Sequence, residues 1–175
     1  MAPELVTAPT VEVVSVGDLR EYLRIDGSEE DYLIQTLRDA AVAHLDGWKG
    51  ILGRAIMSQT WREEFTAWGD LRLSLPDVSS VTVTYEDENE SWQSATGTLR
   101  QDARGWYVET EENVTTERIR VEYDCALPSE HLPAVGIAVK MMVSHWFDNR
   151  GIMGGAGEMP LAVDAILAPL RWGRG

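Results

Sequence analysis

The chain has 175 residues, a formal net charge of −14 and a sequence pI of about 4.5. This length suits one domain, or one domain with an inserted subdomain, and it allows a core without disulfide staples. The acidic balance argues against a surface for DNA phosphates or anionic membranes, because both need clustered lysine and arginine. Residues 1–10 lack the basic and apolar regions of a signal peptide, and no apolar run is long enough to span a membrane.

The start of the chain predicts an extended arm and a short helix. Residues 1–14 contain two prolines and little periodicity, which indicates an extended arm. Ser15 is followed three residues later by Asp18, and this spacing is typical of a capping box at a helix start.

A second and longer helix is predicted next. Ser28 is expected to cap it, and apolar residues then recur at helical spacing until Gly50 and Gly53 end it. About 22 residues at 1.5 Å each give a rod of roughly 33 Å. Its first turn is acidic, which favours the positive end of the helix dipole: Glu29, Glu30 and Asp31.

The middle of the chain changes to alternation of apolar and polar residues, which predicts an antiparallel sheet with one wet face. The acidic stretch 86–90 separates two strands as a turn or tip, and residues 91–105 carry no clear pattern. The alternating apolar positions are Trp61/Phe65, Leu71/Leu73/Leu75, Val81/Val83/Tyr85, Trp106/Val108 and Ile119/Val121/Tyr123.

Residues 132–150 return to helix, with Pro133 in the first turn. Apolar residues cover nearly the whole circumference, so this helix is expected at the centre of a bundle or at a subunit interface. A glycine-rich loop at 151–157 and a last helix at about 161–170 follow.

The order helix–helix–sheet–helix–helix predicts an α+β fold. We expect a small four-helix bundle with an antiparallel β subdomain inserted between helices two and three. The predicted parts are an extended N-terminal arm at 1–14, the bundle at 15–56 and 131–170, the β subdomain at 57–130 and a C-terminal tail at 171–175.

The sequence predicts no catalytic, cofactor-binding or metal site. Glu63 and Glu64 are neighbours on a strand, so they point to opposite faces and cannot act as a carboxylate pair. The histidines are far apart and lack metal-ligand spacing: His44, His131 and His145. The glycine-rich loop lacks the Lys-Ser/Thr of a phosphate loop. Cys125 is expected to be a small core residue.

Several segments resemble the tailed-bacteriophage head–tail connector (adaptor) family, which includes gene-transfer-agent adaptor proteins. The matches run in family order from about residue 15 to 172. One departure is Cys125-Ala126-Leu127, where the family more often has an Ala-Gly type of turn. The matching segments are Leu19–Asp26 with Glu30-Asp31, Gln59-Thr60-Trp61, Leu75-Pro76 with Val81–Tyr85, Ile119–Tyr123, Leu132-Pro133 with Val143–Gly151, and Pro160 with Ala165–Arg171.

The resemblance implies a structural protein without a cofactor. Such proteins form a ring, usually dodecameric, that docks under the portal, extends the DNA channel and presents a surface to the stopper or tail. The implied location is the virion neck, with the host cytoplasm during assembly. Two alternatives stay open: another neck or tail-completion protein, and a soluble enzyme or regulatory module.

Two candidate surfaces follow. Family C-termini tend to insert between portal subunits, and Arg and Trp dominate binding hot spots; the alternative is an inconsequential tail. The portal-binding candidates are Pro169, Leu170, Arg171, Trp172 and Arg174. Negative walls would keep DNA from adhering to a channel. The candidate lumen acids are Glu29, Glu30, Asp31, Glu86, Asp87, Glu88 and Glu90.

Overall fold

A computed structural model describes residues 2–111, 114, 116, 118–149 and 160–173. It confirms an α+β fold with antiparallel sheets. The chain divides into two compact units, each of which is described by itself. The helical unit consists of 12–56 and 128–171, and the β unit consists of 1–11, 57–127 and 172–175. Arg174 and the glycine-rich loop at 151–157 lie outside the described residues.

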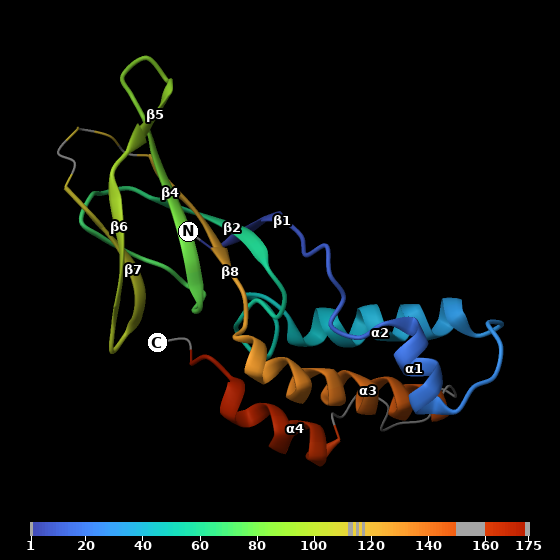
Figure 1. The fold of residues 1–175 in the computed structure, drawn as a ribbon. Helices are drawn as coiled ribbons and strands as arrows, with labels where there is room; N and C mark the ends of the chain where they lie inside the picture. The colour runs from blue at the N-terminus through green and yellow to red at the C-terminus, as the bar shows by residue number, and fades with distance from the viewer. Residues whose placement is uncertain (1, 112–113, 115, 117, 150–159, 174–175) are drawn as a thin grey trace. The chain divides into compact units, whose positions relative to one another are not determined.

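The helical unit is built around α3, which packs against α1, α2 and α4. Side chains from all four helices are fully buried in its core, among them Leu19, Ile34, Val139 and Leu167. Figure 1 shows the helices, whose bounds are α1 Val16–Leu23, α2 Asp31–Leu45, α3 Leu132–Asp148 and α4 Leu161–Leu167, with short 3₁₀ turns at Ser129–His131 and Ala168–Leu170.

The start of α1 confirms the predicted capping box. The backbone N–H of Asp18 donates to Ser15 Oγ at 3.0 Å, and the backbone N–H of Ser15 donates to Asp18 Oδ2 at 3.2 Å. The helix ends where Arg24 adopts a left-handed conformation with φ of 57°. This reciprocal bonding satisfies two backbone donors that the first turn would otherwise leave unpaired.

The predicted bounds of α2 are wrong at both ends. The helix begins at Asp31, because Ser28 enters a turn in which its carbonyl accepts from the Asp31 N–H at 3.2 Å. It ends at Leu45, so its 15 residues give a rod of about 23 Å. The chain then closes a loop, in which Asp46 Oδ1 accepts from the Ile56 N–H at 2.7 Å.

The third helix begins at Leu132, with Pro133 in its first turn as predicted. One side of the helix is buried, including Val135, Ala138 and Met142, and most of its other residues are half-buried. Burial on all sides is not complete in the single chain, since Ile137 remains 38% exposed.

The β unit contains two antiparallel sheets. The five-stranded sheet has the order β1 (Glu4–Thr7), β2 (Gln59–Phe65), β8 (Ile119–Cys125), β4 (Val78–Glu86), β5 (Trp92–Ala95). The three-stranded sheet has the order β3 (Asp70–Arg72), β7 (Gly105–Thr110), β6 (Gly97–Asp102). β1 belongs to the predicted arm, whereas β5 and β6 lie in the stretch that showed no pattern.

The central strand β8 shows why the five-stranded sheet has one wet face. Its apolar residues, including Val121 and Tyr123, are at most 1% exposed, and Cys125 is buried with them as predicted. Its polar residues lie on the opposite face. We call this the polar face; across β2, β8 and β4 it comprises Thr60, Arg62, Glu64, Arg120, Glu122, Asp124, Ser80, Thr82 and Thr84.

Candidate functional site

The C-terminal segment is held in place over its described residues. Leu170 is only 7% exposed, and the Arg171 guanidinium donates to an Asp164 carboxylate oxygen at 2.5 Å. Pro169 lies in the 3₁₀ turn that ends the helical unit. The C-terminal tail expected at 171–175 therefore has contacts with the rest of the chain at Arg171 and Trp172. Arg174 lies outside the described residues.

Trp172 lies against the turn between β6 and β7. A Cβ added at Gly105 would come within 2.9 Å of Trp172 Cζ2, and Gly105 has a φ of 120°. Both facts demand glycine at this position, because a side chain would meet the indole and the backbone conformation is one that L side chains rarely adopt. No pattern in the sequence indicates that these two positions are in contact.

The acids at the start of α2 differ in their surroundings. Asp31 faces Arg20, whose Nε lies 3.3 Å from its carboxylate, so its charge is partly neutralised. Glu30 occupies the N-cap position of α2, and its side chain makes no capping bond. Glu29 is exposed in the turn before the helix.

The acidic tip between β4 and β5 is organised by one of its own members. Asp87 accepts hydrogen bonds from the Ser91 N–H, the Gln93 amide and the Asn89 N–H at 2.8–3.0 Å, and these bonds lower the pKa of its carboxyl group. Glu86 pairs with Arg118 at 2.9 Å. Glu88 and Glu90 are exposed. The prediction of a turn at 86–90 is therefore confirmed, and its exposed charge comes mainly from two of the four acids.

Glu63 and Glu64 point to opposite faces, as predicted. Glu63 is 4% exposed and accepts from the Tyr123 hydroxyl at 2.6 Å and from the backbone N–H and Oγ of Ser74 at 2.8 Å each. Burial, together with the neighbouring Glu63 carboxylate, raises the pKa of Tyr123. Glu64 lies on the polar face and accepts from Arg120 at 3.0 Å. Both acids therefore serve the packing of the β unit.

The histidines lie on different parts of the helical unit: His44 on α2, His131 before α3 and His145 near the end of α3. Within the described ranges, no group of three or more His, Cys, Asp or Glu side chains could hold a metal ion. None of the described helices is long and apolar enough to cross a membrane.

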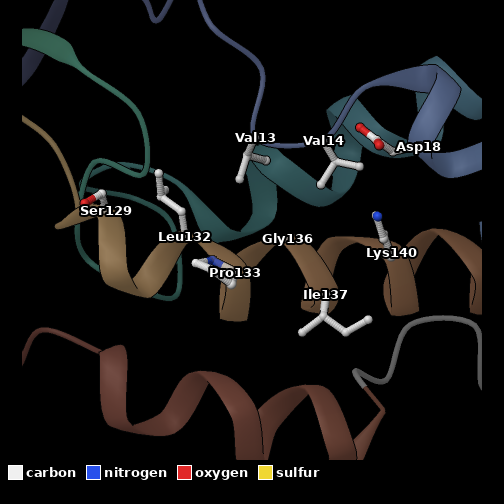
Figure 2. Close-up of a pocket in the computed structure, with 9 residues that line it drawn as sticks. All are labelled: Val13, Val14, Asp18, Ser129, Leu132, Pro133, Gly136, Ile137 and Lys140. Carbon is white, nitrogen blue, oxygen red and sulfur yellow. The ribbon is translucent and has the colours of Figure 1, made fainter.

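A pocket of about 430 Å³ opens between α1, α3 and the segment that precedes α1. Figure 2 shows Val14 and Gly136 along it, with Asp18 and Lys140 on opposite sides. The pKa of Asp18 is lowered mainly by its hydrogen bonds with Ser15 and to a smaller extent by the charge of Lys140. The other lining side chains are mostly aliphatic, so the pocket combines apolar and charged groups and favours no class of ligand.

One feature of the polar face was missed from the sequence. The guanidinium carbons of Arg120 and Arg118 lie 3.9 Å and 5.4 Å from the centre of the Trp92 ring. This stacking places two cations beside β5, at one edge of the five-stranded sheet. Trp92 lies in the stretch without a pattern, Arg120 lies in β8 and Arg118 comes directly before it, so periodicity alone could not bring the three residues together.

The comparisons with known proteins bear on the fold. No protein-family model matches the chain, and no curated protein matches it. Among solved structures, a chain of the "Neck of empty GTA particle computed with C6 symmetry" matches with a TM-score of 0.75 and 23% sequence identity. The match covers 100% of this chain and 97% of the other. The two chains share a fold. The likeness to the GTA neck chain thus extends over practically the full length of both proteins.

Proposed function

We propose that this chain is a structural subunit of the neck of a tailed bacteriophage or gene transfer agent. Copies of it form a ring that connects the portal to the stopper or tail and extends the DNA channel. The observation that carries this proposal is the shared fold with a GTA neck chain over the full length of both. The ordered resemblance to head–tail connectors in the sequence supports the same role independently.

The proposed ring agrees with the symmetry of the similar structure and assigns a role to an exposed strip of α3. The GTA neck was solved with C6 symmetry, and a dodecameric ring, which contains a sixfold axis, is compatible with that symmetry. We interpret the helical unit as a small four-helix bundle into which the β unit is inserted. In the ring, the exposed strip of α3 around Ile137 is a candidate for contact with another subunit. The role requires neither a cofactor nor catalysis, and the chain would reach the neck after synthesis in the host cytoplasm.

We further propose that the acidic surface lines the DNA channel. A duplex moves past negative walls without adhering, because like charges repel and no counterions are released on contact. Glu29, Glu88 and Glu90 are the exposed members of the predicted set and would contribute most of the field. Asp31, Glu86 and Asp87 have partners in the chain, so their carboxylates contribute less.

The C-terminal segment is the proposed portal-binding surface. It comprises Pro169, Leu170, Arg171, Trp172 and Arg174. Within the β unit, Trp172 lies against the β6–β7 turn. Arg171 and Trp172 have the chemistry of binding hot spots, and Leu170 anchors the segment in the helical core.

The neck role is tested by imaging particles that carry a labelled copy of the chain. We expect density for the label between portal and tail; label elsewhere in the particle, or none, contradicts the proposed function.

The portal surface is tested by Trp172→Ala, which should weaken attachment to the portal about thirtyfold, as for a hot-spot residue. Tyr32→Ala is the matched control, because Tyr32 is 85% exposed in the helical unit and lies outside the proposed surface. Equal attachment of both variants would exclude the portal site and leave the neck role standing.

A further inference from the structure

We infer that neighbouring copies in the ring join edge to edge through their five-stranded sheets. In this arrangement β1 of one copy adds in parallel to the open edge of β5 in the next copy. The inference rests on the proposed ring and names the surface that would close it. It is argued from the two edges of a single sheet, β1 and β5, which lie at opposite ends of the strand order.

The open edge of β5 can be assigned residue by residue. The Glu86 N–H donates to the Arg118 carbonyl at 3.0 Å, so the backbone groups of Glu86 face β8. Along an antiparallel strand these directions alternate, so the backbone groups of Tyr85 face β5, where its partner is Gln93. It follows that Trp92 and Ser94, on either side of Gln93, turn their N–H and C=O groups away from the sheet. Among the described strands, none pairs with that side of β5.

The same alternation, carried across β8 and β2, assigns the outer edge of β1. The backbone N–H and C=O groups of Arg62 and Thr60 point toward β1. Their partners Glu4 and Thr7 therefore use their own backbone groups to bond to β2. Leu5 therefore turns its N–H and C=O outward. A bulge between Leu5 and Thr7 interrupts the edge immediately afterwards, so Leu5 is the main bonding position that β1 offers.

These two edges fit each other in one register. Within one copy, four antiparallel pairings separate β1 from β5, so the two strands run in the same direction. A continuous sheet of equally oriented copies therefore joins β1 of one copy to β5 of the next in parallel. In a parallel ladder, one residue bonds to the two residues that flank its partner. With Leu5 opposite Gln93, the Leu5 N–H would donate to the Trp92 carbonyl, and the Ser94 N–H would donate to the Leu5 carbonyl.

The side chains agree with this register. Leu5 is paired with Trp61 and Gln93 with Tyr85, and both pairs lie on the core side, opposite to the polar face. Leu5 of one copy would therefore lie beside Gln93 of the next on the same side of a continuous sheet. The contact would also cover Leu5, which is 43% exposed in the single chain, and its apolar neighbour Val6, which is 40% exposed.

Charge complementarity supports the same pairing. Glu4 is paired with Arg62 and therefore shares the polar face, where its side chain is 71% exposed. In the proposed register it would approach Trp92 of the next copy, on which Arg118 and Arg120 stack while they also pair with Glu86 and Glu64 of their own chain. The contact joins two different surfaces of the chain, and such head-to-tail contacts generate rings when the rotation closes.

The contact is tested by disulfide cross-linking in assembled particles. Leu5→Cys and Gln93→Cys are combined in one chain, since neighbouring Cα atoms across a ladder lie within disulfide reach. The natural Cys125 is 1% exposed and does not compete. We expect mild oxidation to give a ladder of cross-linked multimers. Each single variant should give none, and neither should Leu5→Cys combined with Thr98→Cys, a matched control on exposed β6.

The outcomes separate this inference from the proposed function. A ladder specific to the Leu5/Gln93 pair supports it. A normally occupied neck without a ladder overturns it and leaves the neck role intact. If the chain is absent from the neck, both the proposed neck ring and the proposed contact between its copies are wrong.

A second pair of variants probes the backbone bond itself. Ser94→Pro removes the N–H that would donate to Leu5, at an edge position where proline is tolerated, and Ser94→Ala keeps it. We expect Ser94→Pro to raise the concentration needed for half-maximal ring assembly about tenfold, the loss expected for one backbone hydrogen bond whose acceptor stays unpaired. Ser94→Ala should assemble normally. Equal assembly of the two variants would contradict the proposed edge contact.

Discussion

The helical unit and the β unit are stabilised in different ways. The helical unit depends on apolar burial around α3, with Ile34, Val139 and Leu167 fully buried. The β unit also has an apolar core, but polar contacts cross both of its sheets: Glu63 with Tyr123, Arg62 with Glu122, and Arg72 with Asp102. Apolar burial is insensitive to protonation, whereas carboxylate contacts depend on it. The two units should therefore respond differently to truncation and to acid.

The largest effect is expected in the helical unit. Ile34→Ala removes a fully buried side chain from α2 and should lower the free energy of unfolding by about 2–5 kcal/mol, through lost burial and the cavity that remains. Chemical denaturation measures this loss. Leu161→Ala is the control, because Leu161 is 88% exposed, and it should change little. Equal losses in the two variants would contradict the assignment of this core.

The β unit should show a smaller loss from a single oxygen atom. Tyr123→Phe removes the hydroxyl that donates to buried Glu63 and should cost about 1.5–3 kcal/mol, as for a hydrogen bond to a charged group. Tyr107→Phe is the matched control, since the Tyr107 ring stacks with Arg72 and keeps this contact as phenylalanine. If both variants unfold at the wild-type denaturant concentration, the bond to Glu63 does not stabilise the unit.

A helix cap should contribute less again. Ser15→Ala removes the side-chain acceptor of the α1 capping box and should cost about 1 kcal/mol. Ser28→Ala should leave stability nearly unchanged, because Ser28 lies in a turn and α2 begins at Asp31. Thermal unfolding of the two variants distinguishes them. A larger loss from the Ser28 variant would restore the helix start predicted from the sequence.

The smallest expected difference between the two units is in their stability at acidic pH. Hydrogen bonding to Arg72 lowers the pKa of Asp102 from 3.8 to about 2, and hydrogen bonds to Thr60 and Ser80 lower the pKa of Asp124. A carboxyl group with a lowered pKa in the folded state stabilises that state above its unfolded pKa and loses this contribution as pH falls through the folded pKa. The contribution of Asp102 should therefore disappear between pH 3.8 and about 2.

Hydrogen exchange resolved along the chain measures this response. As pH falls through that window, β3, β6 and β7 should lose protection before α2 and α3 do. Asp102→Asn should remove part of the pH dependence from these strands and leave the helices unaffected. Simultaneous loss of protection in both units would show that carboxylate contacts do not set the acid limit of the β unit.

The sequence predicted elements whose signals are local. The α1 cap, the proline at the start of α3 and the alternation in β4 and β8 each depend on neighbouring residues, and the structure confirms them. The start of α2 was predicted wrongly because serine is a residue type that often caps helices, whereas the backbone of Ser28 forms a turn. β5 and β6 are mostly polar and carry no alternation strong enough to detect.

The candidate surfaces were predictable only as lists of residues. The exposed acids at positions 29, 88 and 90 could be named from the sequence, but the partner of Asp31 lies on another helix and the partner of Glu86 lies far along the chain, directly before β8. The stack of Arg118 and Arg120 on Trp92 also depends on strand order, which periodicity does not specify. Such contacts require the tertiary fold.

The close contact between Trp172 and Gly105 has a consequence for sequence variation among related chains. The two positions occupy the same space, so a substitution at one changes which residues are acceptable at the other. Chains that keep a large aromatic residue at position 172 should keep glycine at 105, and a chain with a side chain at 105 would need both a small residue at 172 and a different backbone conformation at 105. The pair would then appear as a covarying couple that joins the C-terminus to a β-turn far away in the sequence.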